Sequence, residues 1–159
     1  DDRARGRVRG VDRLARAAEP VSDWIKAVHR LAIRLDGYEM NQTIANDLRS
    51  VPRAIEGFKK RLAEEDNPAV QATLLNTIAD KERQWEHLQK LKNTMERAEY
   101  QLESTLAALG TVYAQLQTID LQGTERGRAD RLRQEISEQV AQLQDVSEAM
   151  DEFANMFAE

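Results

Sequence analysis

The chain has 159 residues and a net charge of −5, and 32% of its residues are charged. This length suits a single domain with a buried core, and its glycines (seven) and prolines (three) are too few for a sheet-rich fold. The absence of cysteine excludes disulfides and thiolate metal sites, and no run approaches the roughly 18 apolar residues of a membrane-spanning helix.

The first part of the chain is predicted to be one irregular helical arm over residues 11–64. Residues 1–10 hold two glycines among arginines, and we expect a flexible basic tail there. Pro20, Gly37 and Pro52 interrupt the arm, and we expect a kink or a break near each of them. The apolar side chains of the arm recur at heptad spacing in two sets, which are Val11, Leu14, Ala18, Val21, Ile25, Val28, Ala32 and Leu35, followed by Ile44, Leu48, Val51, Ile55, Phe58 and Leu62.

A longer helix is predicted over residues 68–121, with a length of about 80 Å at 1.5 Å per residue. Asn67 supplies an N-cap side chain and Pro68 a proline at the first helical position, while Gly123 suits a C-terminal cap. Gly110 lies inside this helix and costs roughly 1 kcal/mol relative to alanine. Either a close approach of another helix or simple tolerance would explain it.

Three heptad positions of the long helix, two of them adjacent, are apolar or partly apolar. A two-stranded coiled coil needs two such positions, whereas a helix that touches two neighbours uses three, so we predict three packed helices. The three positions hold Leu74, Lys81, Leu88, Met95, Leu102, Leu109 and Leu116; then Thr77, Gln84, Leu91, Ala98, Thr105, Val112 and Ile119; and then Ile78, Trp85, Lys92, Glu99, Leu106, Tyr113 and Asp120.

After a turn at residues 122–124, a last helix is predicted over residues 125–158. The connections at 65–67 and 122–124 are short, and short connections force neighbouring helices to run antiparallel. The predicted fold is therefore an all-α, elongated antiparallel three-helix bundle or coiled coil, with one domain over residues 11–159. The apolar set of the last helix is Ala129, Leu132, Ile136, Val140, Leu143, Val146, Met150, Phe153 and Phe157.

The last helix is shorter than its neighbours, so residues 50–87 are predicted to form a two-helix tip. Two helices alone leave apolar side chains in water, and such surfaces favour self-association. We expect a homo-oligomer, with a dimer favoured; the alternative is that the first arm folds over the tip and covers it. The side chains of this predicted surface are Ile55, Phe58, Leu62, Leu74, Leu75, Ile78 and Trp85.

Arginines gather near the start of the chain and at the start of the last helix, and the predicted hairpin brings these two segments to one pole. A basic pole favours an anionic membrane surface; the alternative is a set of ordinary surface arginines. Nucleic acid is not expected, because no aromatic side chains are interleaved for base stacking. The arginines of the predicted pole are Arg5, Arg7, Arg9, Arg13, Arg16, Arg126, Arg128, Arg131 and Arg133.

No catalytic or metal site is predicted. The two histidines, His29 and His87, belong to no zinc-binding or catalytic motif, so we expect no cofactor and no small-molecule substrate. The chain begins at Asp1 without a methionine, and we expect a cytoplasmic piece of a larger protein that is membrane-associated through regions outside this chain. The predicted function is a non-enzymatic scaffold or protein-association module, and the alternative is a peripheral membrane-binding rod.

Overall fold

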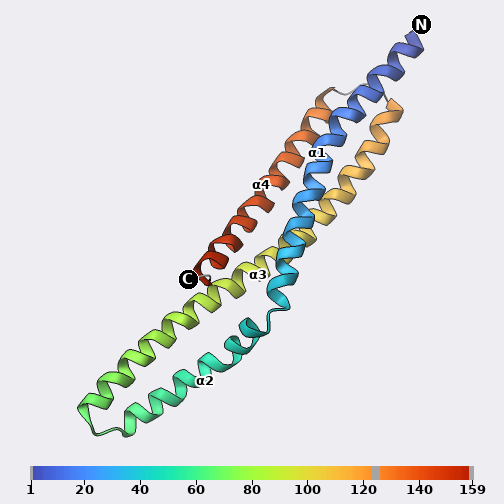
Figure 1. The fold of residues 1–159 in the computed structure, drawn as a ribbon. Helices are drawn as coiled ribbons and strands as arrows, with labels where there is room; N and C mark the ends of the chain where they lie inside the picture. Colours follow the sequence, from blue (N-terminus) through green and yellow to red (C-terminus); the bar gives the residue numbers. More distant parts are fainter. Residues whose placement is uncertain (1, 123–125, 158–159) are drawn as a thin grey trace. The chain divides into compact units, whose positions relative to one another are not determined.

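A computed structural model describes residues 2–122 and 126–157 of the chain, and its side chains over residues 19–116 and 130–155. This part of the chain contains four helices, α1 (Asp2–Glu39), α2 (Gln42–Glu64), α3 (Pro68–Gln122) and α4 (Arg126–Phe157), and no strand. Figure 1 shows them in chain order, coloured from blue to red. The predicted all-α class is confirmed.

The predicted first arm is two helices, and the break expected near Gly37 lies between them at Met40 and Asn41. Asn41 caps the start of α2, because its side-chain oxygen accepts hydrogen bonds from the backbone N–H groups of Thr43 (3.0 Å) and Ile44 (3.2 Å). Asparagine is among the preferred N-cap residues. The sequence signal for the break was therefore the cap residue and not the glycine.

Neither of the first two prolines ends a helix, because Pro20 lies inside α1 and Pro52 lies inside α2. Each helix therefore continues through its proline without a break, and the kink expected as the alternative stays a prediction. An interior proline costs about 3 kcal/mol through its missing N–H and its ring clash. Burial of the adjacent Val51 and of Ile55 offsets that cost in α2. The helix α1 begins at Asp2, so the segment expected as a flexible tail is helical from that residue on.

The predicted long helix is confirmed as α3, 55 residues from Pro68 to Gln122. Its start is capped as expected, since the side-chain oxygen of Asn67 accepts a hydrogen bond from the N–H of Ala69 at 3.0 Å. The side-chain amide of Gln71 also donates to the carbonyl of Glu65 at 2.6 Å and ties the connection to the first turn of α3. The C-cap predicted at Gly123 lies outside the described residues.

The helices divide into two compact units, and the single domain predicted over residues 11–159 stays a prediction. We call Asp36–Glu96 the hairpin unit, and residues 1–35 together with 97–159 the terminal unit. The helix α3 is shared, because its residues up to Glu96 belong to the hairpin unit and those from Arg97 on belong to the terminal unit.

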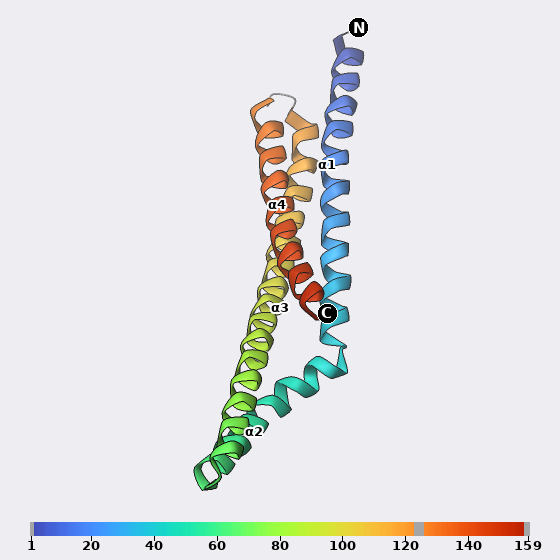
Figure 2. The same cartoon turned by 60° about the vertical axis from the view of Figure 1, so that its left-hand side comes forward.

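The hairpin unit consists mainly of α2 packed antiparallel on the first part of α3 (Figure 1 and Figure 2). Its core joins Val51 and Ile55 of α2 to Leu88 of α3, with Leu48 and Trp85 packed against them. Toward the connection an exposed ion pair, from the Lys59 ammonium to the Glu82 carboxylate at 3.1 Å, links the same two helices. From the core to the ion pair, the residue numbers rise along α2 and fall along α3. The two helices are therefore antiparallel, as predicted from the short connection.

The terminal unit joins three helical segments, from α1, the second part of α3 and α4. A polar contact between side chains links each pair of segments: Trp24 to Thr105, Gln101 to Gln142, and Arg34 to Asp151. Its buried apolar side chains come from all three segments. They include Trp24, Ala27, Leu31 and Leu35 of α1, Ala98 and Val112 of α3, and Leu132, Ile136, Leu143, Val146 and Met150 of α4.

Five predicted core positions of α4 are buried, namely Leu132, Ile136, Leu143, Val146 and Met150, while Val140 and Phe153 are half-buried. The predicted core positions of α1 are partly wrong. Ile25 and Ala32 are exposed, whereas Trp24 and Leu31, one residue earlier in each case, are fully buried. Both sets have heptad spacing, so periodicity alone did not distinguish them. Trp24 turns inward because its indole N–H has a buried partner, Thr105, and a buried tryptophan needs such a partner.

Candidate functional site

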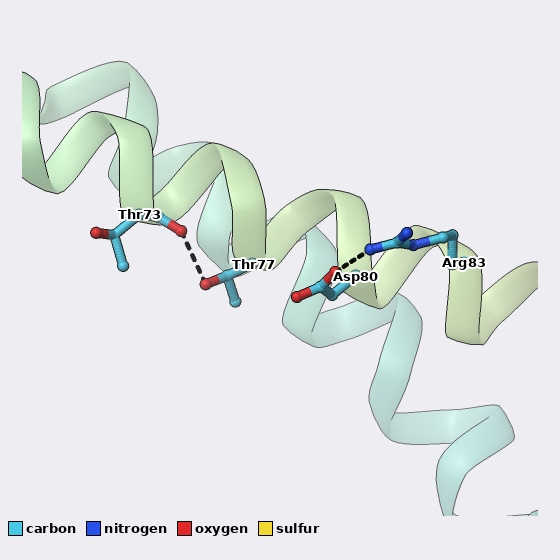
Figure 3. A network of polar contacts seen from close by, with 4 residues as sticks. All are labelled: Thr73, Thr77, Asp80 and Arg83. Carbon is cyan, nitrogen blue, oxygen red and sulfur yellow. Dashed lines mark hydrogen bonds and ion pairs between the residues drawn. The ribbon is translucent and has the colours of Figure 1, made fainter.

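Most of the described polar side chains on α3 that have a partner form hydrogen bonds or ion pairs with groups of the same helix, as Figure 3 illustrates. The hydroxyl of Thr77 donates to the carbonyl of Thr73 at 2.9 Å, and Arg83 forms an ion pair with Asp80 one turn away. Both contacts are exposed, and a side-chain ion pair at this spacing stabilises an isolated helix by only a few tenths of a kcal/mol. Within the described residues, no three His, Asp or Glu side chains converge to hold a metal ion.

The predicted tip surface is covered to a greater extent than the sequence indicates. Ile55 and Ile78 are buried, and only Leu75 is clearly exposed, at 55%. The remaining four, Phe58, Leu62, Leu74 and Trp85, are half-buried. A second exposed apolar residue, Val70, lies five positions before Leu75 and hence about 140° away around the helix. The two side chains do not form one patch.

The predicted arginine pole is described only in part. The side chains of Arg131 and Arg133 are exposed on α4. The side chains of the other seven, Arg5, Arg7, Arg9, Arg13, Arg16, Arg126 and Arg128, lie outside the described ones, although their backbones belong to α1 and α4.

The terminal unit exposes an apolar surface that the sequence analysis placed in the core. Leu106 and Tyr113 belong to the third apolar heptad position, yet their side chains are 56% and 65% exposed. The earlier members of that position, Ile78 and Trp85, are buried or half-buried. The third stripe therefore contacts a neighbour only in the hairpin unit, and farther along α3 it faces solvent.

This surface lies in a stretch without charge. Residues 104–119 contain no Asp, Glu, Lys, Arg or His, in a chain that is 32% charged. We define the neutral face as the exposed side chains of α3 that lie within about 60° of Gly110 around the helix axis in this stretch. Its described members are Leu106, Ala107, Gly110, Tyr113 and Ala114, all exposed. The uncharged run was visible in the sequence and could have identified this surface.

A second exposed apolar pair, Ile25 and Ile33 on α1, is less suited to association. His29 lies between them at helical spacing, and Lys26 and Arg30 flank the pair, all three exposed. An interface there would require partial desolvation of charged side chains, which is unfavourable unless they are paired. The centre of a protein–protein interface is depleted of charged residues relative to the rest of the protein surface. The neutral face is therefore the better candidate for an association surface.

No protein-family model, curated protein or solved structure matches this chain. Among the described residues, no helix combines the length and the apolar character needed to cross a bilayer.

Proposed function

We propose that this chain is a non-enzymatic helical association module that forms homo-oligomers. The observation that carries the proposal is the exposure of Leu106 and Tyr113 on the neutral face. Removal of apolar surface from water contributes roughly 25 cal/mol per Å², and a face without charge requires no desolvation of ions. Because the tip is largely covered by its own two helices, the proposed surface is the neutral face on the second part of α3 and not the tip.

The proposal includes the arrangement of the terminal unit as an antiparallel three-helix bundle. The contact between each pair of its segments supports this arrangement, and so does the core, to which all three contribute. A bundle of this kind places one helix face outward on each segment. On α3 the outward face is the neutral face.

Sedimentation velocity over a range of protein concentrations tests the proposed function. The expected result is a mass above that of the monomer that rises with concentration. The double variant Leu106→Glu/Tyr113→Glu should shift the distribution toward monomer, while Leu75→Glu, which also replaces an exposed leucine of α3, should not. A chain that stays monomeric at every concentration would overturn the proposal.

A second candidate function, binding to an anionic membrane surface, is favoured by the exposure of Arg131 and Arg133 at the start of α4. Co-sedimentation with vesicles of anionic or neutral lipid tests it. Binding to anionic vesicles that weakens with salt, and weakens further on replacing Arg5, Arg7, Arg9, Arg13 and Arg16 with Gln, would support it. Equal pelleting with both kinds of vesicle would reject it.

A further inference from the structure

We propose that the neutral face binds a second copy of this chain, with the two α3 helices antiparallel and related by a twofold axis at Gly110. This inference rests on the proposed function and adds the partner, the surface and the arrangement. It starts from a face that is open. A Cβ added at Gly110 would meet nothing within 4 Å, so no other element of the described chain packs there.

The face points away from the core of its own unit. Thr105 and Val112 are the buried side chains of this part of α3. At about 100° per residue they lie some 140° to 160° around the helix from Gly110. The helix therefore uses one side for its own unit and leaves the other side to a partner. The intrinsic penalty of about 1 kcal/mol for a helical glycine has no compensation within the chain.

The shape of the face is self-complementary about Gly110. Leu106 and Ala114 lie four residues before and after the glycine, and Ala107 and Tyr113 lie three before and after it. A twofold antiparallel pair thus places Leu106 in one layer with the partner's Ala114, and Tyr113 in one layer with the partner's Ala107. These four layers each join a large side chain to a small one, and the two glycines meet at the axis. The same patch on both copies thus complements itself, as in an isologous interface.

The charges on the same side of α3 select this orientation. Glu103 and Glu99, both exposed, continue the line of the face toward the start of the helix. In a parallel pair each carboxylate would face its own copy, which is destabilising. In the antiparallel pair the two Glu103 residues are about 21 Å apart along the axis, so their carboxylates do not face each other.

The size of the contact sets its strength. A helix contact over four turns is about 22 Å long and 10–12 Å wide, which is well below the roughly 800 Å² per partner of a standard interface. We therefore expect a reversible dimer that forms only at elevated protein concentration. Because the face is neutral, sodium chloride should leave its affinity nearly unchanged, whereas sulfate should strengthen it.

Cysteine cross-linking tests the arrangement directly, since the natural chain contains no cysteine. Three single variants are compared under mild oxidation, namely Gly110→Cys at the proposed axis, Glu103→Cys on the same face, and Gly57→Cys as a matched control at an exposed helical glycine with open surroundings. A disulfide requires Cα atoms within about 7 Å, so only Gly110→Cys should form the covalent dimer, at least about tenfold faster than Gly57→Cys. Circular dichroism checks that each variant retains its helices.

The outcomes separate this inference from the proposed function. Selective cross-linking of Gly110→Cys supports the twofold antiparallel dimer. Efficient cross-linking of Glu103→Cys would indicate a parallel pair, and equal rates for all three would indicate random collisions; either result overturns the inference. If sedimentation shows a dimer that Leu75→Glu abolishes, the chain is still a homo-oligomeric association module, but it associates through the tip. The inference then fails, together with the surface that the proposed function names. A strict monomer overturns both.

Discussion

The indole Nε1 of Trp24 donates a hydrogen bond of 2.7 Å to the hydroxyl oxygen of Thr105, and both residues are 0% exposed. The two residues are 81 positions apart and join α1 to the second part of α3. Thr105 is the buried polar residue of the described core. Because a buried tryptophan N–H without a partner is costly, this pair sets the rotation of α1 toward α3.

Replacement of Thr105 by valine should destabilise the chain by about 1–3 kcal/mol, because it leaves the Trp24 N–H buried without an acceptor. The matched control is Thr111→Val on the same helix. Its hydroxyl is exposed and donates to the carbonyl of Ala107, so we expect a change within about 0.5 kcal/mol. Urea denaturation measures both. Equal losses from the two variants would show that the hydroxyl of Thr105 has no special role.

The pair can be examined further with Trp24→Phe, which removes the donor. In the background of Thr105→Val this change should cost less than it does in the natural chain, with a coupling of about 0.5–3 kcal/mol in a double-mutant cycle. Additive losses would mean that the two side chains contribute only through packing.

Truncation of Leu143 to alanine should cost about 2–5 kcal/mol, the range for a buried leucine whose removal leaves a cavity. This side chain of α4 is fully buried in the terminal unit. The neighbouring Gln144 is exposed, so Gln144→Ala serves as the control and should change the free energy of unfolding by less than about 0.5 kcal/mol. A loss below about 1 kcal/mol for Leu143→Ala would place this face of α4 in solvent.

The ion pair between Arg34 and Asp151, with a distance of 2.6 Å between Nη1 and Oδ1, should contribute little to stability. Both side chains are largely exposed, and exposed pairs are worth about 0–1 kcal/mol. Asp151→Asn should therefore lower stability by less than about 1 kcal/mol, and the difference should vanish at 1 M salt, where the Debye length is about 3 Å. Asp145→Asn on the same helix provides the comparison. A large loss of unfolding free energy in Asp151→Asn that persists in high salt would show that the ion pair contributes more than an exposed pair does.

Two helical glycines should respond alike in stability and differently in association. A Cβ at Gly57 or at Gly110 meets nothing within 4 Å, so each change to alanine should stabilise the dilute chain by about 1 kcal/mol. At high concentration, Gly110→Ala should also weaken the reversible dimer, since it inserts two methyl groups at the twofold axis. Gly110→Cys carries a similar cost, but its disulfide traps the dimer once it forms. Thermal unfolding and sedimentation measure the two effects. Destabilisation by Gly57→Ala would reveal a contact on that side of α2.

The parts of the fold that depend on local sequence features, such as helix caps and short connections, could be predicted from the sequence. The Asn67 cap, the short connection after α2 and a run from Pro68 to Gln122 with no further proline and only one glycine define α3 and the hairpin, and the structure contains both. The buried line of α4 through Leu143 and Met150 follows from one unambiguous periodicity. In these places, capping and burial favour the same structure.

The remaining features depend on tertiary contacts that no local pattern contains. The choice between Trp24 and Ile25 depends on Thr105, which lies on another helix. Leu106 and Tyr113 continue an apolar stripe whose earlier members, Ile78 and Trp85, are buried or half-buried. The candidate site was missed because an apolar stripe with core-like spacing does not reveal which of its members another helix covers.

Pro52 makes α2 dependent on a segment that the ribosome synthesises later. Proline has no backbone N–H, so the carbonyl of Leu48 lacks its usual partner one turn on. A helix of 23 residues with that defect is not stable alone in water. Its folding has to wait for Trp85 and Leu88, against which Val51 and Ile55 pack. The nascent hairpin should therefore form in a single late step, and a chain truncated before Leu88 should keep this segment as coil.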